Sequence, residues 1–430
     1  MKDKFGVRRP VSEGVTRRAA LKLAATAAVV TGASQLAPPA IISARGEQPI
    51  KVGVDEPMTG TYAVTGKNEI NGIRLAAKEI NAKGGILGRP VELIIEDSTS
   101  GDAGVAVQKA HELIDRDKVN FLIGNVNSGL TIAMAVVANQ KNVLMIDPGG
   151  HANQITGRTC KWNVFQVCPS TGLLVNAIAP TLIKKFGKRF YFLVPDYAFG
   201  HSLLRSYERN LKKYGATNLG AELIPLGTAD YSANLIKAQA AKPDIIVILQ
   251  NGEDQVNALK QAVQFGLDKR FHIAGANIEL ESLEALPPAS RIGTWVIEWY
   301  WNQPPIPGLK EFVDTTKKEF GGVPTARNWF GHTAMWSCAL AANEAKSLDP
   351  LKMAKALNGY KLPKEIGLEP HDPFYRENQH LLIGTLYFGT AQEKGSTPDD
   401  LFHITDIIDD KTIVDSVEET GCKMTWPASI

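Results

Sequence analysis

The titratable residues of this 430-residue chain are scattered rather than grouped as in a catalytic centre. None of its 8 histidines shows the spacing of a zinc-protease helix, in which two histidines stand four residues apart with a glutamate between them. No GxSxG segment supplies a serine nucleophile. Gly60–Asn68 resembles a phosphate-binding loop, but it has one residue too many between its glycines, and Asp406, Asp409 and Asp410 lack the spacing of a calcium loop. The sequence therefore predicts a protein that is not an enzyme, with no cofactor and no metal site.

Glycines and small polar residues gather instead in loops that follow predicted strands. These loops are residues 58–66, 124–131, 147–152, 196–202, 250–254 and 275–279. Open parallel sheets bind ligands at the carboxyl ends of their strands, where such loops meet, and helix N-termini there offer N–H groups to anions. The pattern predicts capture and release of a small molecule between two lobes that close by hinge motion.

Alternating strands and helices must position these loops. Short apolar runs occur at 50–54, 91–96, 119–124, 143–146, 189–194, 245–249 and 271–274, and amphipathic helical patterns separate them. This alternation predicts an α/β fold with two doubly wound parallel-sheet lobes joined by a multi-strand hinge. We place lobe 1 at 45–165 plus about 294–350, lobe 2 at 166–293 plus about 351–400, and a C-terminal segment at 401–430. The aromatic cluster at 295–301 is interpreted either as a core strand or as a hinge bordering the cleft.

Residues 1–44 have the features of an export signal. Arg17 and Arg18 precede an uncharged stretch, Leu23–Ile42, with small residues near its end, and the paired arginines resemble a twin-arginine motif. We expect a periplasmic protein exported by that route. The formal net charge of the whole chain, +2, is too balanced to indicate a nucleic-acid partner.

Four cysteines reach this oxidising compartment, namely Cys160, Cys168, Cys338 and Cys422. None lies in a CxxC motif, so structural disulfides are predicted. Four cysteines allow three pairings, and the sequence does not choose among them.

Several segments also resemble a known family. Ile80–Arg89 reads INAKGGILGR, and it is joined by Met58–Gly60, Phe121–Gly124 and Val194–Gly200 (VPDYAFG). Over roughly residues 50–390 the chain resembles the periplasmic leucine/isoleucine/valine-type binding proteins. The resemblance implies a type I periplasmic-binding fold and a monomer that captures a small carboxylate-bearing solute, an amino acid or an aromatic acid. It also implies membrane permease subunits of an ATP-driven importer as partners.

The resemblance assigns most candidate site residues to the first lobe and its facing loops. Ser128 matches the serine that receives the ligand carboxylate, and the loop Gly149, Gly150 and His151 matches further carboxylate contacts, with His151 replacing the usual Thr or Ser. Phe199 stands where a tyrosine commonly covers the ligand. Tyr62, Thr65 and Tyr197 are expected to form walls of the site.

The second lobe resembles the leucine/isoleucine/valine-type binding proteins less closely than the first lobe does. The acidic residue that pairs with an amino-acid ammonium aligns with Asn277, and an aromatic position aligns with Asn251. Glu253, Asp254 or Glu279 are possible substitutes, although each is also explained as a helix-start or surface carboxylate. Because a buried ammonium without a carboxylate is costly, an aromatic acid, an amide or urea stays open beside an amino acid. A ligand sensor of the same fold is the alternative function, with a secreted enzyme behind it.

Overall fold

The computed structural model describes residues 48–430, which form one compact unit. The expected export signal, residues 1–44, lies outside the described residues. None of the helices described is both long enough and apolar enough to cross a membrane.

The first lobe is built on a five-stranded parallel sheet in the order β2-β1-β3-β4-β5. Ile50, Val52 and Val54 of β1 are fully buried, as expected for a strand covered on both faces. The strands are β1 (Ile50–Glu56), β2 (Val91–Asp97), β3 (Phe121–Ile123), β4 (Leu144–Asp147) and β5 (Val164–Gln166). The helices between them are α1 (Ala63–Ala82), α2 (Ala103–His111), which continues as a π-helical turn at Glu112–Arg116, and α3 (Ser128–Gln140).

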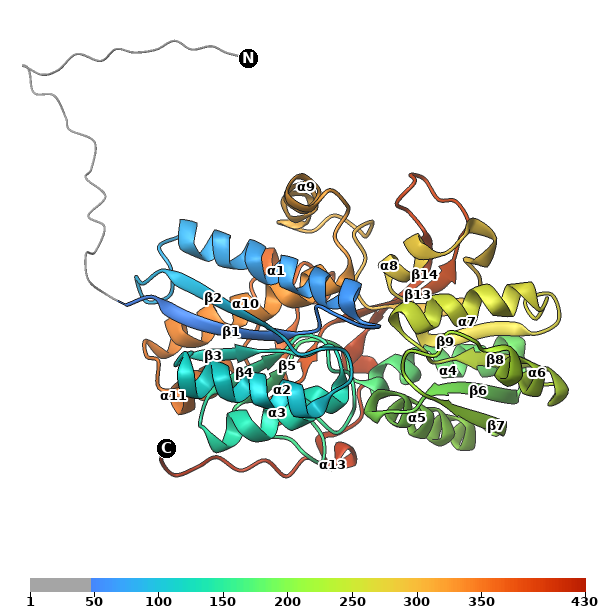
Figure 1. Ribbon diagram of the computed structural model, residues 1–430, viewed down its shortest axis with the longest axis horizontal. Helices are drawn as coiled ribbons and strands as arrows, with labels where there is room; N and C mark the ends of the chain where they lie inside the picture. The colour runs from blue at the N-terminus through green and yellow to red at the C-terminus, as the bar shows by residue number, and fades with distance from the viewer. Residues whose placement is uncertain (1–47) are drawn as a thin grey trace, which may run out of the picture. The chain divides into compact units, whose positions relative to one another are not determined.

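The second lobe is built on a seven-stranded sheet in the order β14-β13-β10-β9-β8-β6-β7, and it lies beside the first lobe in Figure 1. Its strands are β6 (Arg189–Pro195), β7 (Thr217–Ile224), β8 (Ile245–Ile248), β9 (His272–Asn277), β10 (Thr294–Ile297), β13 (Thr385–Ala391) and β14 (Phe402–Asp409). Its helices are α4 (Thr171–Phe186), α5 (Ala198–Tyr214), α6 (Ser232–Ala240), α7 (Gly252–Gln264) and α8 (Leu280–Ala285), followed by a 3-10 turn at Pro288–Ser290. Strand β13 runs antiparallel to both neighbours, which the predicted parallel sheet does not include.

After β10 the chain returns to the first lobe. The returning helices are α9 (Leu309–Phe320), α10 (Ala326–Ala345), α11 (Pro350–Leu357) and α12 (Lys364–Gly367), and the short strands β11 (Phe374–Tyr375) and β12 (Leu382–Ile383) pair before the chain crosses to β13. Helix α10 packs along α1, and both contribute to one buried apolar core. The chain thus passes between the lobes after β5, after β10 and between α12 and β13, which makes the hinge multi-stranded.

Several segments, α12 among them, lie elsewhere than the predicted lobe boundaries place them. Strand β10, expected in lobe 1, pairs with β9 and β13 of the second sheet. Helix α11, expected in lobe 2, packs against α10 and β4 of the first lobe. Strand β14, expected in a separate C-terminal segment, pairs with β13. An apolar run identifies a strand but not the sheet that the strand joins. The local sequence pattern therefore could not predict which lobe these segments belong to.

The aromatic cluster belongs to the protein interior. Trp295 lies on β10, and Trp295, Trp299 and Tyr300 are each no more than 1% exposed. The interpretation as a core strand is therefore correct for the part within β10.

One disulfide, Cys160–Cys422, forms among the described residues. It joins the loop after β4 to the chain beyond β14, which carries a 3-10 turn at Asp410–Thr412 and the short helix α13 (Val417–Thr420). Cys168 and Cys338 are buried free thiols, and burial raises the pKa of both. The prediction of structural disulfides is confirmed for one pair and wrong for the other.

Candidate functional site

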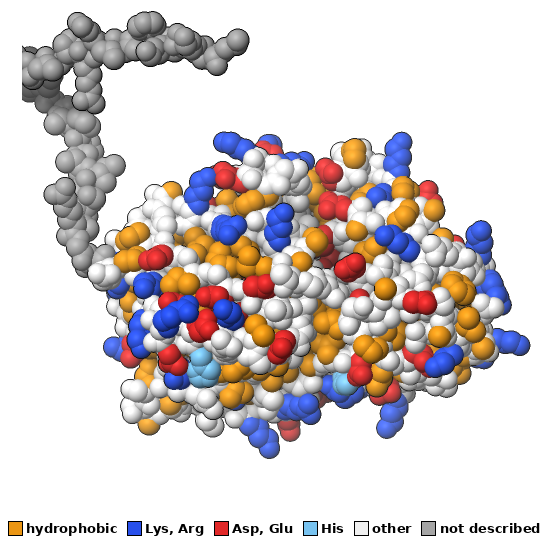
Figure 2. All heavy atoms as spheres, viewed as in Figure 1, with side chains coloured by type: hydrophobic (Ala, Val, Ile, Leu, Met, Phe, Trp, Pro, Cys, Tyr) orange, Lys and Arg blue, Asp and Glu red, His pale blue; other side chains and the backbone are white. Residues whose placement is uncertain are grey.

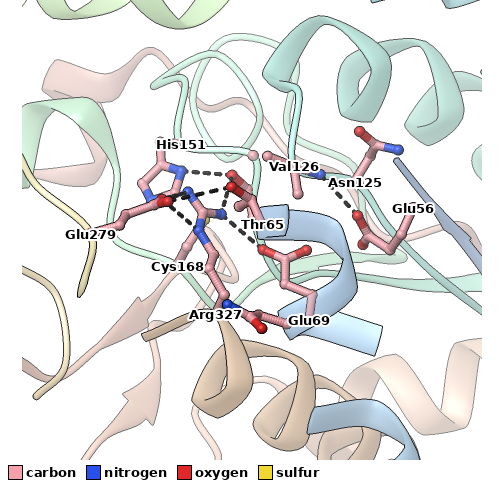
Figure 3. A network of polar contacts seen from close by, with 12 residues as sticks. Glu56, Thr65, Glu69, Asn125, Val126, His151, Cys168, Glu279 and Arg327 are labelled. Atoms are coloured by element: carbon pink, nitrogen blue, oxygen red, sulfur yellow. Dashed lines mark hydrogen bonds and ion pairs between the residues drawn. The ribbon is translucent and has the colours of Figure 1, made fainter. Parts of the chain in front are cut away.

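The carboxyl ends of the two sheets face each other, and charged side chains of both lobes meet between them (Figure 3). Arg327, 2% exposed, lies at the centre. Its Nη1 donates to Glu69 Oε1 of α1 at 2.8 Å, and its Nε donates to Glu279 Oε1, just after β9, at 2.6 Å. Arg327 thus ion-pairs with one carboxylate from each lobe.

Local structure fixes this arginine. It is the second residue of α10, whose start carries a capping box in which the Thr325 amide donates to Asn328 Oδ1 at 2.9 Å. Asn328 Nδ2 in turn donates to the Asn68 carbonyl of α1 at 2.8 Å. The cap therefore sets both the beginning of α10 and its position against α1, next to Glu69.

Further carboxyls surround the ion pair. Glu56 accepts a hydrogen bond from the Val126 amide at 3.1 Å and faces Glu69, and burial together with that neighbour raises the pKa of Glu56 well above its usual range. Burial and the proximity of Glu279 raise the pKa of Glu281 to about 8. The interior of the cleft is thus richer in carboxyl groups than in bases.

His151 is buried in the cleft, at 2% exposed, and not a surface loop residue. Its Nδ1 lies 2.6 Å from the Gly149 carbonyl, and its Nε2 lies 2.6 Å from Glu298 Oε1. Its ring packs edge-on against Phe199 at 5.8 Å between centroids. Because Phe199 belongs to α5 of the second lobe, this contact also joins the lobes.

The loop after β4, predicted to contact a ligand carboxylate together with Ser128, packs against the start of α3 with its backbone donors in use. The Ser128 hydroxyl accepts from the Ala152 amide at 3.1 Å. The amides of Gly149 and Gly150 donate to Asp147 Oδ1 at 3.2 and 2.7 Å, so they do not point freely into the cleft. A Cβ at Gly149 would lie 2.4 Å from Glu69 Oε1, which explains why glycine stands against the ion pair.

The remaining predicted residues meet across the cleft. The Tyr62 and Tyr197 hydroxyls lie 2.5 Å apart and link the lobes. Glu279 accepts from Asn251 Nδ2 at 3.3 Å and from the Thr65 hydroxyl at 3.5 Å. Asn277 is 3% exposed, and its Nδ2 has no hydrogen-bond partner among the described residues.

The exposed face of the molecule differs from this interior. Figure 2 shows basic and acidic side chains interspersed over the visible surface. On α2 and the turn after it they form ion pairs, for example Lys109 with Glu96 at 3.0 Å. No group of three or more His, Cys, Asp or Glu side chains in the described part of the chain could hold a metal ion.

Comparison with known proteins agrees with this architecture. A sequence model of the periplasmic binding protein family matches residues 49–396. The chain belongs to that family. This establishes the family predicted from Ile80–Arg89 and its companion segments, and the family is one of periplasmic proteins.

Individual members of the periplasmic binding protein family align along most of the chain. The Leu/Ile/Val-binding protein homolog 7 of Brucella suis is 27% identical, covering 72% of this chain and 80% of its own. A periplasmic binding protein from Burkholderia mallei superposes with a TM-score of 0.81 at 25% identity, covering 87% of this chain and 98% of its own. The amino acid ABC transporter substrate-binding protein from Pseudomonas fluorescens Pf-5 has a TM-score of 0.77 at 25% identity, covering 87% and 99%. The two-lobed α/β fold class is thereby confirmed.

Sequence reasoning missed the centre of the site in this family member. Arg327, Glu69 and Glu298 were not among the candidates, and Glu279 was only a possible substitute. Glu69 and Arg327 are 258 residues apart and lie within helices, where a charged residue ordinarily indicates a solvated face. Only the position of Glu279 in the sequence could have indicated a role in the site, because this residue ends the loop that follows a predicted strand.

Proposed function

We propose that this protein is the solute-binding component of an ATP-driven importer and captures a small carboxylate-bearing solute, an amino acid or an aromatic acid, between its lobes. One observation carries the proposal: polar side chains from both lobes converge, buried, at the carboxyl ends of parallel strands in the two sheets. The relatives support it, since the Pseudomonas protein is named as an amino acid ABC transporter substrate-binding protein.

The proposed binding residues come from both lobes. Ser128 and His151 hold the carboxylate, while Gly149 and Gly150 shape the loop that presents His151. Tyr62, Thr65, Tyr197 and Phe199 form the walls. Asn251 and Asn277 complete the site from the second lobe, and the free Asn277 Nδ2 donates to the solute.

Capture works by closure and involves no covalent step, so the protein is not an enzyme. Contacts such as Tyr62 with Tyr197 exist only when the lobes are together, and a solute that bridges the lobes adds to them. Its higher affinity for the closed form shifts the equilibrium toward closure. The closed monomer then docks on membrane permease subunits, after export by the twin-arginine route.

Buried Glu279 changes the balance among candidate solutes. The argument against an α-amino acid depended on the lack of a carboxylate in the second lobe, yet Glu279 is 1% exposed and bonded to Asn251. Arg327 binds Glu279 Oε1, and Oε2 accepts only from the Thr65 hydroxyl at 3.5 Å, so an ammonium group has an anionic oxygen to bind. We propose an amino acid ahead of an aromatic acid.

Thermal-shift measurements on residues 48–430 test the proposal, with branched-chain, polar and basic amino acids, aromatic acids, amides and urea as probes. A solute at 100 times its Kd stabilises the folded protein by about 2.7 kcal/mol, which raises the melting temperature measurably. If none of the probes raises it, the proposed function is wrong.

The site assignment is tested with Asn277→Ala. Loss of a hydrogen bond from a buried amide to a charged solute weakens binding by about 1–3 kcal/mol. The control, Asn234→Ala on α6, removes a half-buried asparagine outside the cleft and should leave affinity unchanged. Equal affinities of the two variants would remove Asn277 from the site.

A further inference from the structure

The ionisable groups buried between the lobes do not balance in charge. The carboxyls include Asp147, whose Oδ1 accepts from the Gly149 and Gly150 amides, and also Glu56, Glu69, Glu279, Glu281 and Glu298, all 8% exposed or less. The bases facing them in the described structure are Arg327 and His151.

Tracing the pairs shows which carboxyl is left over. Arg327 is shared by Glu69 and Glu279, and His151 faces Glu298. Glu56 accepts a hydrogen bond from the Val126 amide at 3.1 Å and lies next to Glu69, away from the residues that line the cavity described below. Glu281 has no base beside it: Asn68 Nδ2 lies 3.4 Å from its Oε1, and its Oε2 has no hydrogen-bond partner in the described structure.

Glu281 also lines a cavity that opens to solvent. The cavity has a volume of about 380 Å³, and its lining includes Thr65, Glu281 and Ser282. Glu253 and Lys260 of α7 lie at its rim, where both are at least partly exposed to water. Lys260 lines the same cavity, but no ion pair within 4.0 Å joins it to Glu281.

The surrounding groups suit a cation better than a second anion. Next to Glu279, Asn251 Oδ1 is buried without a hydrogen-bond donor among the described residues, so it can accept from an ammonium group. A cation beside Glu281 would stabilise the charged form of this carboxyl, which burial and the nearby Glu279 otherwise disfavour, whereas a carboxylate there would add to the repulsion.

We infer that the solute is cationic overall: an amino acid with a positively charged side chain, whose terminal nitrogen binds Glu281 while its α-carboxylate and α-ammonium occupy the site proposed above. The inference rests on the proposed function. It narrows the solute class from amino acids in general to basic ones.

Three probes with the same six-carbon skeleton separate the contributions that the carboxylate, the α-ammonium and the side-chain ammonium make to binding affinity. Titration calorimetry is run with hexanoate, norleucine and lysine on residues 48–430. Lysine should bind at least 10-fold more tightly than norleucine, and hexanoate should bind most weakly. Norleucine binding as tightly as lysine would overturn the inference.

Failure of the inference is distinguishable from failure of the proposed function. If leucine or an aromatic acid binds and lysine does not, the importer role stands and the cationic class is wrong. If these probes and the wider panel all fail to bind, the proposed function falls, and the inference falls with it.

A matched pair of variants locates the effect. Glu281→Gln keeps the shape of the side chain and removes its charge, so the lysine-to-norleucine affinity ratio should drop to about one. Glu253→Gln removes an exposed carboxylate from the rim of the same cavity and should leave the ratio unchanged. A ratio that Glu281→Gln leaves intact would overturn the assignment of Glu281, and melting curves of both variants establish that they are folded.

Discussion

Arg327 is the residue on which the buried charges of the cleft depend. It is 2% exposed and ion-pairs with Glu69 and Glu279 from opposite lobes. Breaking a buried pair by removing one partner costs about 3–5 kcal/mol, because an uncompensated charge stays behind. We expect Arg327→Met to lower the free energy of unfolding, measured by urea denaturation, by that amount.

The double variant Arg327→Met/Glu279→Gln is the internal control. It removes one of the two stranded charges, so it should be more stable than Arg327→Met alone. A single variant within about 1 kcal/mol of the natural protein would contradict the prediction, since it would mean that water screens the pair.

For single residues, the sequence predicted where a side chain lies better than it predicted which group that side chain bonds to. The loops after the strands were correctly located, and His151, Tyr62, Tyr197 and Phe199 do meet between the lobes. What each group bonds to depends on contacts across hundreds of residues. For this reason the sequence predicted neither the role of Arg327 nor the hydrogen bond from the Gly149 amide to Asp147.

The crossing of α1 and α10 is the contact between elements that brings Glu69 to Arg327. The helices touch through glycines: a Cβ at Gly72 would lie 1.9 Å from the Asn328 carbonyl, and one at Gly331 would lie 2.0 Å from the Glu69 carbonyl. Real Cβ atoms do not approach backbone oxygens so closely, so any side chain there pushes the helices apart.

We therefore expect Gly331→Ala to destabilise the protein by about 1–3 kcal/mol, as overpacking of a tight interior does. It should also weaken solute binding, because α10 moves with Arg327. Gly322→Ala is the matched control, since a Cβ there meets nothing within 4 Å. Equal melting temperatures and affinities for the two variants would show that the crossing has room to spare.

Periodicity revealed the elements themselves. Runs of buried apolar residues predicted β1, β2, β6 and β8, and the amphipathic patterns predicted the helices that connect them. The antiparallel course of β13 and the membership of β10 in the second sheet were not predicted. Both are matters of which edge a strand pairs with, and a short apolar run carries no information on that.

For the whole molecule, the chain beyond β14 adds a connection between the lobes that the family match, ending at residue 396, does not include. Near the second lobe, Asp415 pairs with Arg209 of α5 at 2.6 Å and accepts from Asn176 of α4 at 3.0 Å. Met424 and Trp426 then pack against the core of the first lobe. The red C-terminal segment in Figure 1 follows this path past α13.

The disulfide Cys160–Cys422 fastens this segment to the first lobe. A cross-link between residues 262 positions apart limits the freedom of the unfolded chain, and loss of a disulfide typically costs about 2–4 kcal/mol. We expect Cys422→Ser to lower the free energy of unfolding by this amount and to speed trypsin cleavage after Lys423, which is already exposed but then lies on a freer backbone. A reductant should reproduce the loss in the natural protein and have no effect on the variant. An unchanged denaturation midpoint of the natural protein in reductant would contradict this prediction. In that case the packing of Trp426 and the ion pair of Asp415 would hold the segment, and non-covalent contacts alone would join the two lobes there.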